Sequence, residues 1–414
     1  MSDKFDLVRI LTIPPNGGIL KSKEIPYAEF KNARHNGTNI DINCIVRGMG
    51  DFSEKRSDAL IVPDDKIIPT PLLDTERTRT GIAMSRILDH NGEGSPYCVR
   101  SILAKTAAKL PYEVMIGAEL EFNLLKGKPD GKITKDDFLD NSDYADFDPM
   151  TPGGKFRVAL FEMARDMGIE IEALHSENYG ALHEAILKYK SAMDTADNVV
   201  ILSEFVRMLA TKHGHHAVFD PKILGKGHFG SGLHMHLSCA DKKDGRNLFY
   251  DDGVKLSRFA DDFTAGAVHR ARELGFFMGP DVIKSYERIS DAGFEAPAST
   301  AVNSGDRSAW VRVPNGANRV EFRGPDPSLA TREFCHYPHL TMTALINAGH
   351  EGVTNKGIFD ADVPKLAKTP IGTYSAMKSS HDEKDGGDVL GIPHEYMGHL
   401  LKARYNAMCD KDIY

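Results

Sequence analysis

The sequence predicts an α+β protein built from two structural units, and three observations support this prediction. The first hundred residues contain short apolar stretches separated by turn-forming residues, which is typical of a small sheet. From about Cys98 onward, amphipathic helical patterns alternate with strand-like segments. The length of 414 residues corresponds to two or three domains, and a hydrophobic content of 41% is that of an ordinary globular chain.

The N-terminal unit is predicted to be a small sheet. Residues 7–13, 19–25 and 59–62 are predicted strands, and the turn-forming residues 14–18 separate the first two. Residues 70–96 show little apolar periodicity, so we predict connecting structure there, followed by a linker near the end of the unit.

The larger unit is predicted to contain several amphipathic helices, because apolar residues recur in it at helical spacing. Polar stretches rich in Asp, Lys or Gly predict exposed loops at residues 126–148 and 378–388. The predicted helices cover residues 155–168, 191–214, 255–277, 339–353 and 389–409.

Composition argues against several classes of protein. No apolar run approaches the roughly 20 residues that span a bilayer, and residues 1–10 lack the order of a signal peptide. We therefore expect a soluble, cytoplasmic protein with no membrane partner. The net charge of −8 argues against a nucleic-acid partner. The five cysteines show no CxxC spacing, which predicts neither a disulfide framework nor a thiolate zinc site.

Three predicted strands each place two ionisable residues on one face. Side chains alternate along a strand, so residues two positions apart share a face and the residue between them points the other way. A half-solvated sheet shows the same pattern for any single pair, but three pairs together favour a functional site. The pairs are Glu119 and Glu121, His234 and His236, and Glu321 and Arg323, with Leu120, Met235 and Phe322 between them.

Two further glutamates, Glu177 and Glu184, flank a turn-prone segment at residues 178–180 that could bring them together. Five glutamates and one imidazole suit two hard divalent cations such as Mg²⁺ or Mn²⁺, which favour oxygen ligands and accept a single His. A zinc site would contain more His or Cys and is the lesser alternative. Taken alone, Glu177 and Glu184 are also consistent with the exposed first turn of a helix.

Arginines accumulate downstream of these glutamates. Guanidinium groups bind carboxylate and phosphate through paired hydrogen bonds, so together with two metals they could neutralise a phosphoryl group in transfer. Singly, each one also fits a surface ion pair. Two of them flank the sole tryptophan in an apolar stretch, which favours burial of at least one beside an anionic partner. The residues are Arg288, Arg307, Arg312, Arg319 and Arg323.

Two common catalytic motifs are absent from the sequence. The glycine-rich residues 225–232 are followed by Leu233 and His234 rather than by Lys and a hydroxyl residue, which excludes a P-loop. No GxSxG motif occurs, so a serine hydrolase is unsupported.

In their order along the chain, these motifs resemble those of the glutamine synthetase family. The resemblance covers nearly the whole chain, because ILKSKEIP at residues 19–26 and SDALIVPD at residues 57–64 also look like its N-terminal domain. The motifs that carry it are ExE at Glu119, two glutamates seven apart from Glu177, GSGxHxH from Gly230, Arg288, the pair Arg307 and Arg312, and RVEFRGPDP from Arg319.

The resemblance implies a β-grasp domain at residues 1–100 and a catalytic domain at residues 101–414. The catalytic domain would contain a curved antiparallel half-barrel sheet backed by helices. The resemblance also implies a homo-oligomer in which two stacked hexameric rings form a dodecamer. Each active site would lie between neighbouring subunits of a ring.

The same resemblance implies two or more Mg²⁺ or Mn²⁺ ions in each site and ATP as co-substrate. Residues that would hold the first ion are Glu121, Glu177 and Glu184, and those for the second are Glu119, His234 and Glu321. Residues that would bind ATP are His236, Ser238, Arg312 and Arg319.

Glutamate and a small amine are the remaining substrates that the resemblance implies. Arg307 would stabilise the transferring phosphoryl group, Glu295 would lie on a flap over the site, and Glu177 or Glu295 would take the proton of the amine. Residues that would bind glutamate are Arg323 at the side-chain carboxylate, Arg288 at the α-carboxylate, and Gly230, Glu121 and His234.

Three features depart from the family pattern. Phe229 stands where ammonia-using members commonly carry Asn, the segment between Arg288 and the flap is one residue longer, and Asn-Gly-Thr-Asn at residues 36–39 replaces the Asp-Gly-Ser-Ser latch. We therefore expect a small alkylamine such as methylamine to be accepted at least as well as ammonium. Ammonia specificity would return if Asp41 or Asp51 supplied the missing carboxylate.

The resemblance implies an ATP-dependent ligase of nitrogen metabolism, which joins an amine to the γ-carboxylate of glutamate through γ-glutamyl phosphate. A glutamate–polyamine or glutamate–ethanolamine ligase is an alternative within the family. A guanidino kinase would share the half-barrel and the arginines but would not need five glutamates or the GSGxHxH strand. A non-catalytic homologue would be expected to have lost ligands, and all six are present.

Overall fold

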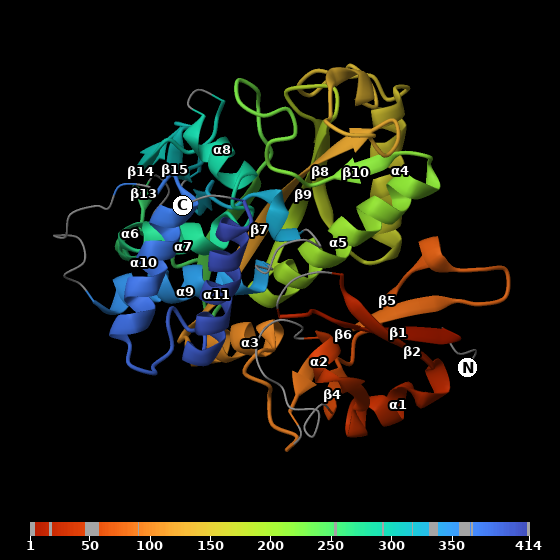
Figure 1. Cartoon of the computed structure of the whole chain (residues 1–414), viewed down its shortest axis with the longest axis horizontal. Coiled ribbons are helices and arrows are strands. Elements are labelled where there is room, and N and C mark those ends of the chain that lie inside the picture. The colour runs from red at the N-terminus through yellow and green to blue at the C-terminus, as the bar shows by residue number, and fades with distance from the viewer. Residues whose placement is uncertain are drawn as a thin grey trace.

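The structure is a computed structural model in which two sheets of unequal size each carry their own helices. In Figure 1, the N-terminal elements β1, β2, β4 and α1 lie together on one side of a larger body. The described residues are 5–15, 19–45, 58–89, 91–251, 255–291, 294–316, 318–330, 338–355, 365 and 367–411.

The N-terminal sheet has six strands in the described part of the chain. They are β1 (Leu7–Thr12), β2 (Lys21–Pro26), β3 (Thr38–Asp41), β4 (Asp58–Pro63), β5 (Ile68–Pro69) and β6 (Thr80–Leu88). The order is β2-β1-β6-β4-β3 with β5 beside β6, and only β1 and β6 run parallel. Helix α1 (Tyr27–Asn36) packs through Phe30 onto Phe5, Val8 and Ala83, and the single turn α2 (Ile42–Ile45) follows β3.

The three predicted N-terminal strands are confirmed, but the prediction of connecting structure for residues 70–96 is wrong. β6 occupies nine of these residues and pairs with β1, β4 and β5. Ile82, Ala83 and Met84 are buried in succession, because both faces of this central strand are covered. A strand buried on both faces shows no alternation of apolar and polar residues, so the pattern that identifies a half-buried strand is missing.

The larger sheet is the curved half-barrel that the resemblance implies. Its strands are β7 (Tyr112–Leu125), β8 (Ile171–Ser176), β9 (Leu182–Ser191), β10 (His216–Val218), β11 (Leu233–Asp241), β14 (Ser299–Ser304), β15 (Ala309–Val313) and β16 (Val320–Phe322). The order is β14-β15-β16-β11-β7-β9-β8, with β10 beside β7. Only β14 and β15 run parallel, and β12 (Tyr250–Asp251) and β13 (Lys255–Leu256) form a separate ribbon.

Helices cover the convex side of this sheet and the C-terminal part of the molecule (Figure 1). They are α3 (Val99–Lys109), α4 (Pro152–Asp166), α5 (Ala192–Lys212), α6 (Arg258–His269), α7 (Ala271–Met278), α8 (Lys284–Ser290), α9 (Pro338–Thr354), α10 (Pro370–Glu383) and α11 (His394–Cys409). Among the described residues, no helix is long and apolar enough to cross a membrane.

The predicted helices at 155–168, 191–214 and 339–353 are confirmed as α4, α5 and α9. The stretch predicted as one helix at 255–277 is two, because the chain changes direction at Arg270 between α6 and α7. The predicted loop at 378–388 is partly wrong, since α10 continues to Glu383. The last helix begins at His394, directly after Pro393, rather than at Val389, because proline favours a helix start and not an interior.

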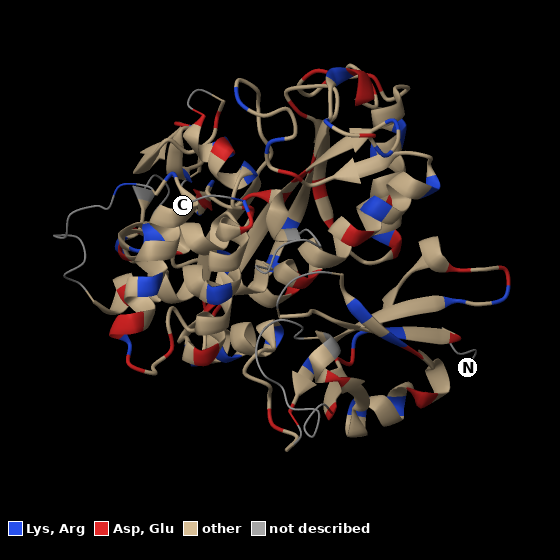
Figure 2. Cartoon of the chain, viewed as in Figure 1, with Lys and Arg blue, Asp and Glu red and all other residues tan. Residues whose placement is uncertain are grey.

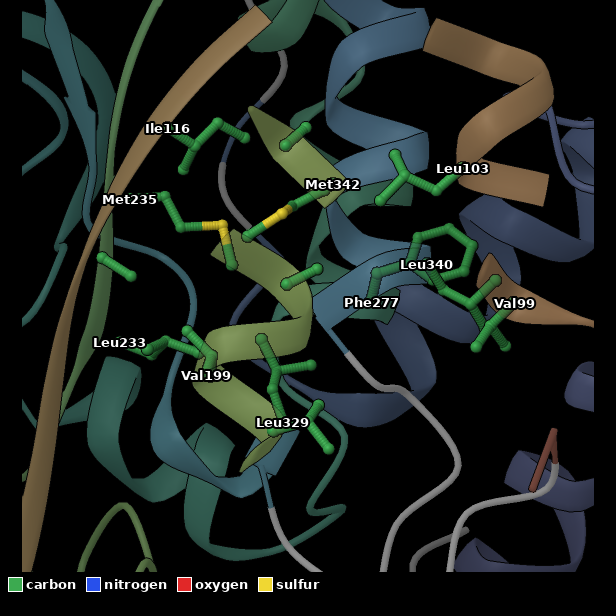
Figure 3. Packing of buried hydrophobic residues seen from close by; sticks show 14 of the residues in the cluster. Val99, Leu103, Ile116, Val199, Leu233, Met235, Phe277, Leu329, Leu340 and Met342 are labelled. Atoms are coloured by element: carbon green, nitrogen blue, oxygen red, sulfur yellow. The ribbon is translucent and has the colours of Figure 1, made fainter. Parts of the chain in front are cut away.

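One continuous apolar core joins the sheet to the helices behind it. The residue types alternate on β7 and β11, so one face of each strand supplies the core and the other stays polar. Figure 3 shows side chains from α5 and α9 against those of the two strands. The residues labelled there are Val99, Leu103, Ile116, Val199, Leu233, Met235, Phe277, Leu329, Leu340 and Met342.

A buried ion-pair network connects three of the core helices. Arg100 of α3 donates to both carboxylate oxygens of Asp197 on α5, at 2.9 and 2.8 Å, and His339 of α9 lies 2.9 Å from the same carboxylate. Burial opposes ionisation of Asp197, but the hydrogen bond to His339 and the charge of Arg100 outweigh it and lower its pKa. The network therefore stabilises the fold above the usual carboxyl pKa, and this contribution is lost as the pH falls through the lowered value.

We predict that Asp197→Ala lowers the free energy of unfolding by about 3–5 kcal/mol, because it leaves the buried Arg100 without its main counter-charge. Asp64→Ala is the matched control. It removes the other acidic partner of Arg100, but its side chain is 44% exposed, so we expect a loss of no more than about 1 kcal/mol. Urea unfolding measures both, and equal losses would contradict the structural role assigned to Asp197.

Candidate active site

The register of the central strands brings the predicted residues together on one face of the sheet. Glu119 of β7 lies opposite His234 of β11, and His236 lies opposite Glu321 of β16. Their side chains are in contact: Glu119 Oε2 is 3.0 Å from His234 Nδ1, and its Oε1 is 2.7 Å from His236 Nε2. Leu120 between the glutamates is fully buried in the core. The period-two prediction is therefore confirmed for this face.

A hairpin between β8 and β9 delivers the other two glutamates. Glu177 follows the end of β8, and Glu184 lies on β9 opposite Glu121 of β7. Residues 178–181 form the turn, so the two glutamates come back toward one point and do not begin an exposed helix. His175 joins them, with its Nε2 at 2.9 Å from Glu177 and 3.5 Å from Glu184.

Within the described residues, three groups of side chains could each hold a metal ion. In each group, the ligand atoms lie within 4.8 Å of one another. One group, Glu119, His234 and Glu321, is the set expected for the second ion. The three glutamates expected for the first ion are divided between the other two groups, each of which also contains a histidine. These groups are Glu121, Glu184 and His234, and His175, Glu177 and Glu184.

The charges of this face suit divalent cations. Burial, and then the carboxylate of Glu177, raises the pKa of Glu121 to about 8. Burial, and then four neighbouring carboxylates, raises that of Glu184 to about 10. Burial and Arg323 lower the pKa of His234 to about 4, which keeps the imidazole neutral and able to bind metal. A cation among the carboxylates would offset their repulsion, so the residues present fit Mg²⁺ or Mn²⁺.

A cavity of about 170 Å³ is lined by this acidic face and by four arginines. Figure 2 shows the acidic residues on the strands in the middle of the molecule. Arg288 on α8 is only 3% exposed and donates to the carbonyl oxygens of Gly324 and Arg323 at 3.2 and 3.0 Å. The arginines that line the cavity are Arg288, Arg307, Arg312 and Arg323.

Glu321 is the counter-charge for two of these arginines. Arg312 on β15 and Arg323 after β16 both bind its carboxylate, and it is fully buried. Burial opposes ionisation, but His234 and Arg323 lower the pKa of Glu321. Arg312 is largely buried and pairs with Glu321. It therefore meets the expectation that an arginine beside the tryptophan lies against an anion.

Glu295, which the resemblance places on a flap, lies in the loop between α8 and β14. Glu295 lines the cavity and pairs with Arg307 at 3.1 Å, with both side chains close to half exposed. Its φ of 57° is a left-handed conformation that is unusual outside glycine. Its carbonyl accepts from Arg323 Nη2 at 3.0 Å, so Arg323 holds the flap backbone as well as Glu321.

A larger cavity of about 560 Å³ lies beside the first, and Glu119 and Ile186 line both. Of the residues expected to bind ATP, His236, Ser238 and Arg319 line the larger cavity, and Arg312 lines the smaller one. Arg319 Nε donates to His236 Nδ1 at 3.1 Å. The remaining walls are partly apolar, with Met115, Leu187 and Tyr189 among their residues. Apolar walls suit a planar base.

Gly230 lines the smaller cavity beside Phe229, where a Cβ at this glycine would lie 2.6 Å from the carbonyl oxygen of Pro221. Close backbone approach therefore requires glycine there. Asp41, a candidate for the missing latch carboxylate, lies on β3 of the N-terminal sheet and lines neither cavity. Asp51 lies outside the described residues.

Several residues of the smaller cavity were not predicted from the sequence, among them His175, Tyr144 and Phe294. His175 lies two positions before Glu177, the same spacing as in the other pairs, so it could have been found by extending that pattern. Tyr144, whose ring packs edge-on against His175, lies in a loop with no regular period. Phe294 contacts Phe229 edge-on at 5.4 Å, a contact between distant loops.

Comparisons with known proteins identify relatives of the chain. A model of the glutamine synthetase catalytic domain matches residues 96–368. The glutamine synthetase of Thermus thermophilus is 33% identical over 351 residues, 82% of this chain and 75% of that protein. That of Methanosarcina mazei is 33% identical over 419 residues, 96% of this chain and 88% of that protein.

Solved structures share the fold. One described as a GmaS/ADP complex matches 99% of this chain and 95% of its own, with a TM-score of 0.82 at 22% identity. The family model covers more than half of the chain, and the sequence relatives extend across most of it. The chain therefore belongs to the glutamine synthetase family, whose members are ATP-dependent ligases that form carbon–nitrogen bonds.

Proposed function

We propose that the chain uses ATP to join a small amine to the γ-carboxylate of glutamate through γ-glutamyl phosphate. The observation that supports this most strongly is that two cavities meet at Glu119 and Ile186. A nucleotide base suits the larger, partly apolar cavity. Its phosphates would then point to the smaller cavity, which contains four arginines and the acidic face.

Metal binding is assigned to the acidic face. Bound Mg²⁺ or Mn²⁺ would supply the positive charge that offsets the negative charge of a phosphoryl group in transfer. Residues proposed to hold the first ion are Glu121, Glu177 and Glu184, with His175 added, and those for the second are Glu119, His234 and Glu321.

The arginines divide the substrate contacts between them. Arg307, which is partly exposed and held by Glu295, is placed to move onto the transferring phosphoryl group and stabilise its charge. Arg288 and Arg323, buried and held by carbonyl oxygens, provide fixed guanidinium groups for the α- and γ-carboxylates of glutamate. Fixed donors lower the cost of orienting glutamate for attack on ATP.

The second half-reaction needs an uncharged amine. The amine attacks the acyl carbon, phosphate leaves with the electron pair of the C–O bond, and Glu177 or Glu295 takes the proton of the ammonium ion. Phe229, Phe294 and Tyr144 line the same cavity. Aromatic faces bind alkylammonium ions and contact their methyl groups, which favours a small alkylamine such as methylamine over ammonium.

A ring oligomer is also proposed. Apolar side chains are exposed on the loop and helix beside the smaller cavity, with Phe147 94% exposed and Met150 and Phe161 nearby. Large exposed apolar patches mark protein interfaces. A neighbouring copy covering them would close the site that Tyr144 borders.

We predict that Glu121→Gln lowers activity at least about a hundredfold, since a lost metal ligand removes several kcal/mol of transition-state stabilisation. Calorimetric titration should show weaker Mn²⁺ binding. Glu170→Gln is the control, because Glu170 is exposed and pairs only with Lys188 and Lys190 among its described contacts, and it should leave both quantities unchanged. Full activity of Glu121→Gln at saturating Mg²⁺ would refute the metal assignment.

We predict that phosphate release with methylamine at least equals that with ammonium, measured beside ethanolamine and putrescine at equal concentrations. Phe229→Asn should shift the preference toward ammonium by about tenfold, because a polar side chain replaces an aromatic face. Activity with ammonium alone would contradict the alkylamine preference. No activity with any amine would leave only a non-catalytic homologue.

We predict that light scattering detects a ring oligomer and that activity disappears on dilution to the monomer. Phe147→Ser should weaken the assembly, since it removes an exposed apolar contact. A stable and fully active monomer would exclude a site completed by a neighbour.

A further inference from the structure

Lys222 is the feature that the proposed reaction leaves unexplained. It lies between β10 and β11, and its side chain is 0% exposed, which is rare for a lysine. Its ammonium group lies 2.9 Å from Asp291 Oδ2 and also donates to the carbonyl oxygen of His228. A buried ammonium group is costly unless paired, so these two contacts must hold firmly in the folded chain.

The Lys222–Asp291 pair joins two loops that are distant in sequence. Asp291 follows α8 and leads into the flap, and it also accepts a hydrogen bond from the backbone N–H of Gly227 at 2.8 Å. One carboxylate therefore binds the side chain of Lys222 and the glycine-rich loop together. The flap and this loop are held as a unit from one side.

The same lysine supports an aromatic wall. Its Nζ lies 5.1 Å from the ring centroid of Phe294, within the range of a cation–π contact. Phe294 packs edge-on against Phe229 at 5.4 Å, and both rings line the smaller cavity with Glu295. The ammonium group thus lies against a ring that lines the cavity, although Lys222 itself does not line it.

We propose that Lys222 is a positioning residue that sets the amine-acceptor wall by clamping Asp291 and Phe294, an inference that rests on the proposed function. It touches no substrate, because it lines neither cavity. Loss of its charge frees Asp291 and lets the Phe294–Phe229 pair and Glu295 shift. The larger cavity is lined by other elements and keeps its shape.

The test compares Lys222→Met, Asp291→Asn and the double variant in the full-length protein. Each should raise the KM for the best amine by roughly ten- to a hundredfold, the effect of a misplaced contact, and leave the KM for ATP within about twofold. The amine KM of the double variant should rise no more than that of the more affected single variant, because all three variants remove the same interaction. Lys222→Arg retains the charge and should recover part of the loss.

Lys284→Met is the matched control. Lys284 pairs with Asp220 close to the same loop, but its side chain is 35% exposed and does not contact Phe294 in the described structure, so its amine KM should stay near that of the wild type. Equal rises in the KM for ATP and for the amine, or additive losses in the double variant, would overturn the clamp.

Hydrogen exchange separates this proposal from the proposed reaction. Lys222→Met should speed amide exchange in the peptide that contains Gly227, whatever the substrate of the enzyme. If the wild-type protein releases no phosphate with any amine, the proposed reaction fails, while faster exchange still supports the clamp. Unchanged exchange at Gly227 in Lys222→Met and Asp291→Asn would refute the clamp even in an active enzyme.

Discussion

Repulsion among buried carboxylates on one face of the half-barrel is the constraint on which the rest of the site depends. Glu119 and Glu121 lie on β7 and Glu184 lies on the neighbouring strand β9, so hydrogen-bonded register fixes them near one another. The chain cannot separate these charges without breaking the sheet. It offsets part of their cost with His234 and with the arginines that line the same cavity, and the remaining repulsion favours a divalent cation.

Arg323 extends this electrostatic balance from the sheet to the flap. Its guanidinium group binds Glu321 on the acidic face and also the carbonyl oxygens of Arg307 and Glu295. One side chain therefore fixes the distance between the strand that bears the carboxylates and the loop that covers them. Arginine suits this role because its planar group carries five donors in a fixed geometry.

Much of the site was predictable from sequence because strand geometry has a simple period. Alternation alone put the two members of each pair on one face of their own strand, and the register of β7, β11 and β16 brings Glu119, His234 and Glu321 side by side. Alternation did not identify β6, because both faces of that strand are buried. It also gives no information on loops such as the one that contains Tyr144. The Lys222–Asp291 contact spans distant segments, and no local pattern encodes such a contact.

The distribution of side chains between strands and loops has a consequence for how the family can diversify. The carboxylates Glu119, Glu121 and Glu184 project from strands in the middle of the sheet. The aromatic rings of Phe229 and Phe294, which pack against each other, come from two loops. Substitutions in these loops would leave the register of the carboxylate-bearing strands unchanged, so under the proposed function the amine acceptor could differ between relatives that share the same phosphoryl chemistry.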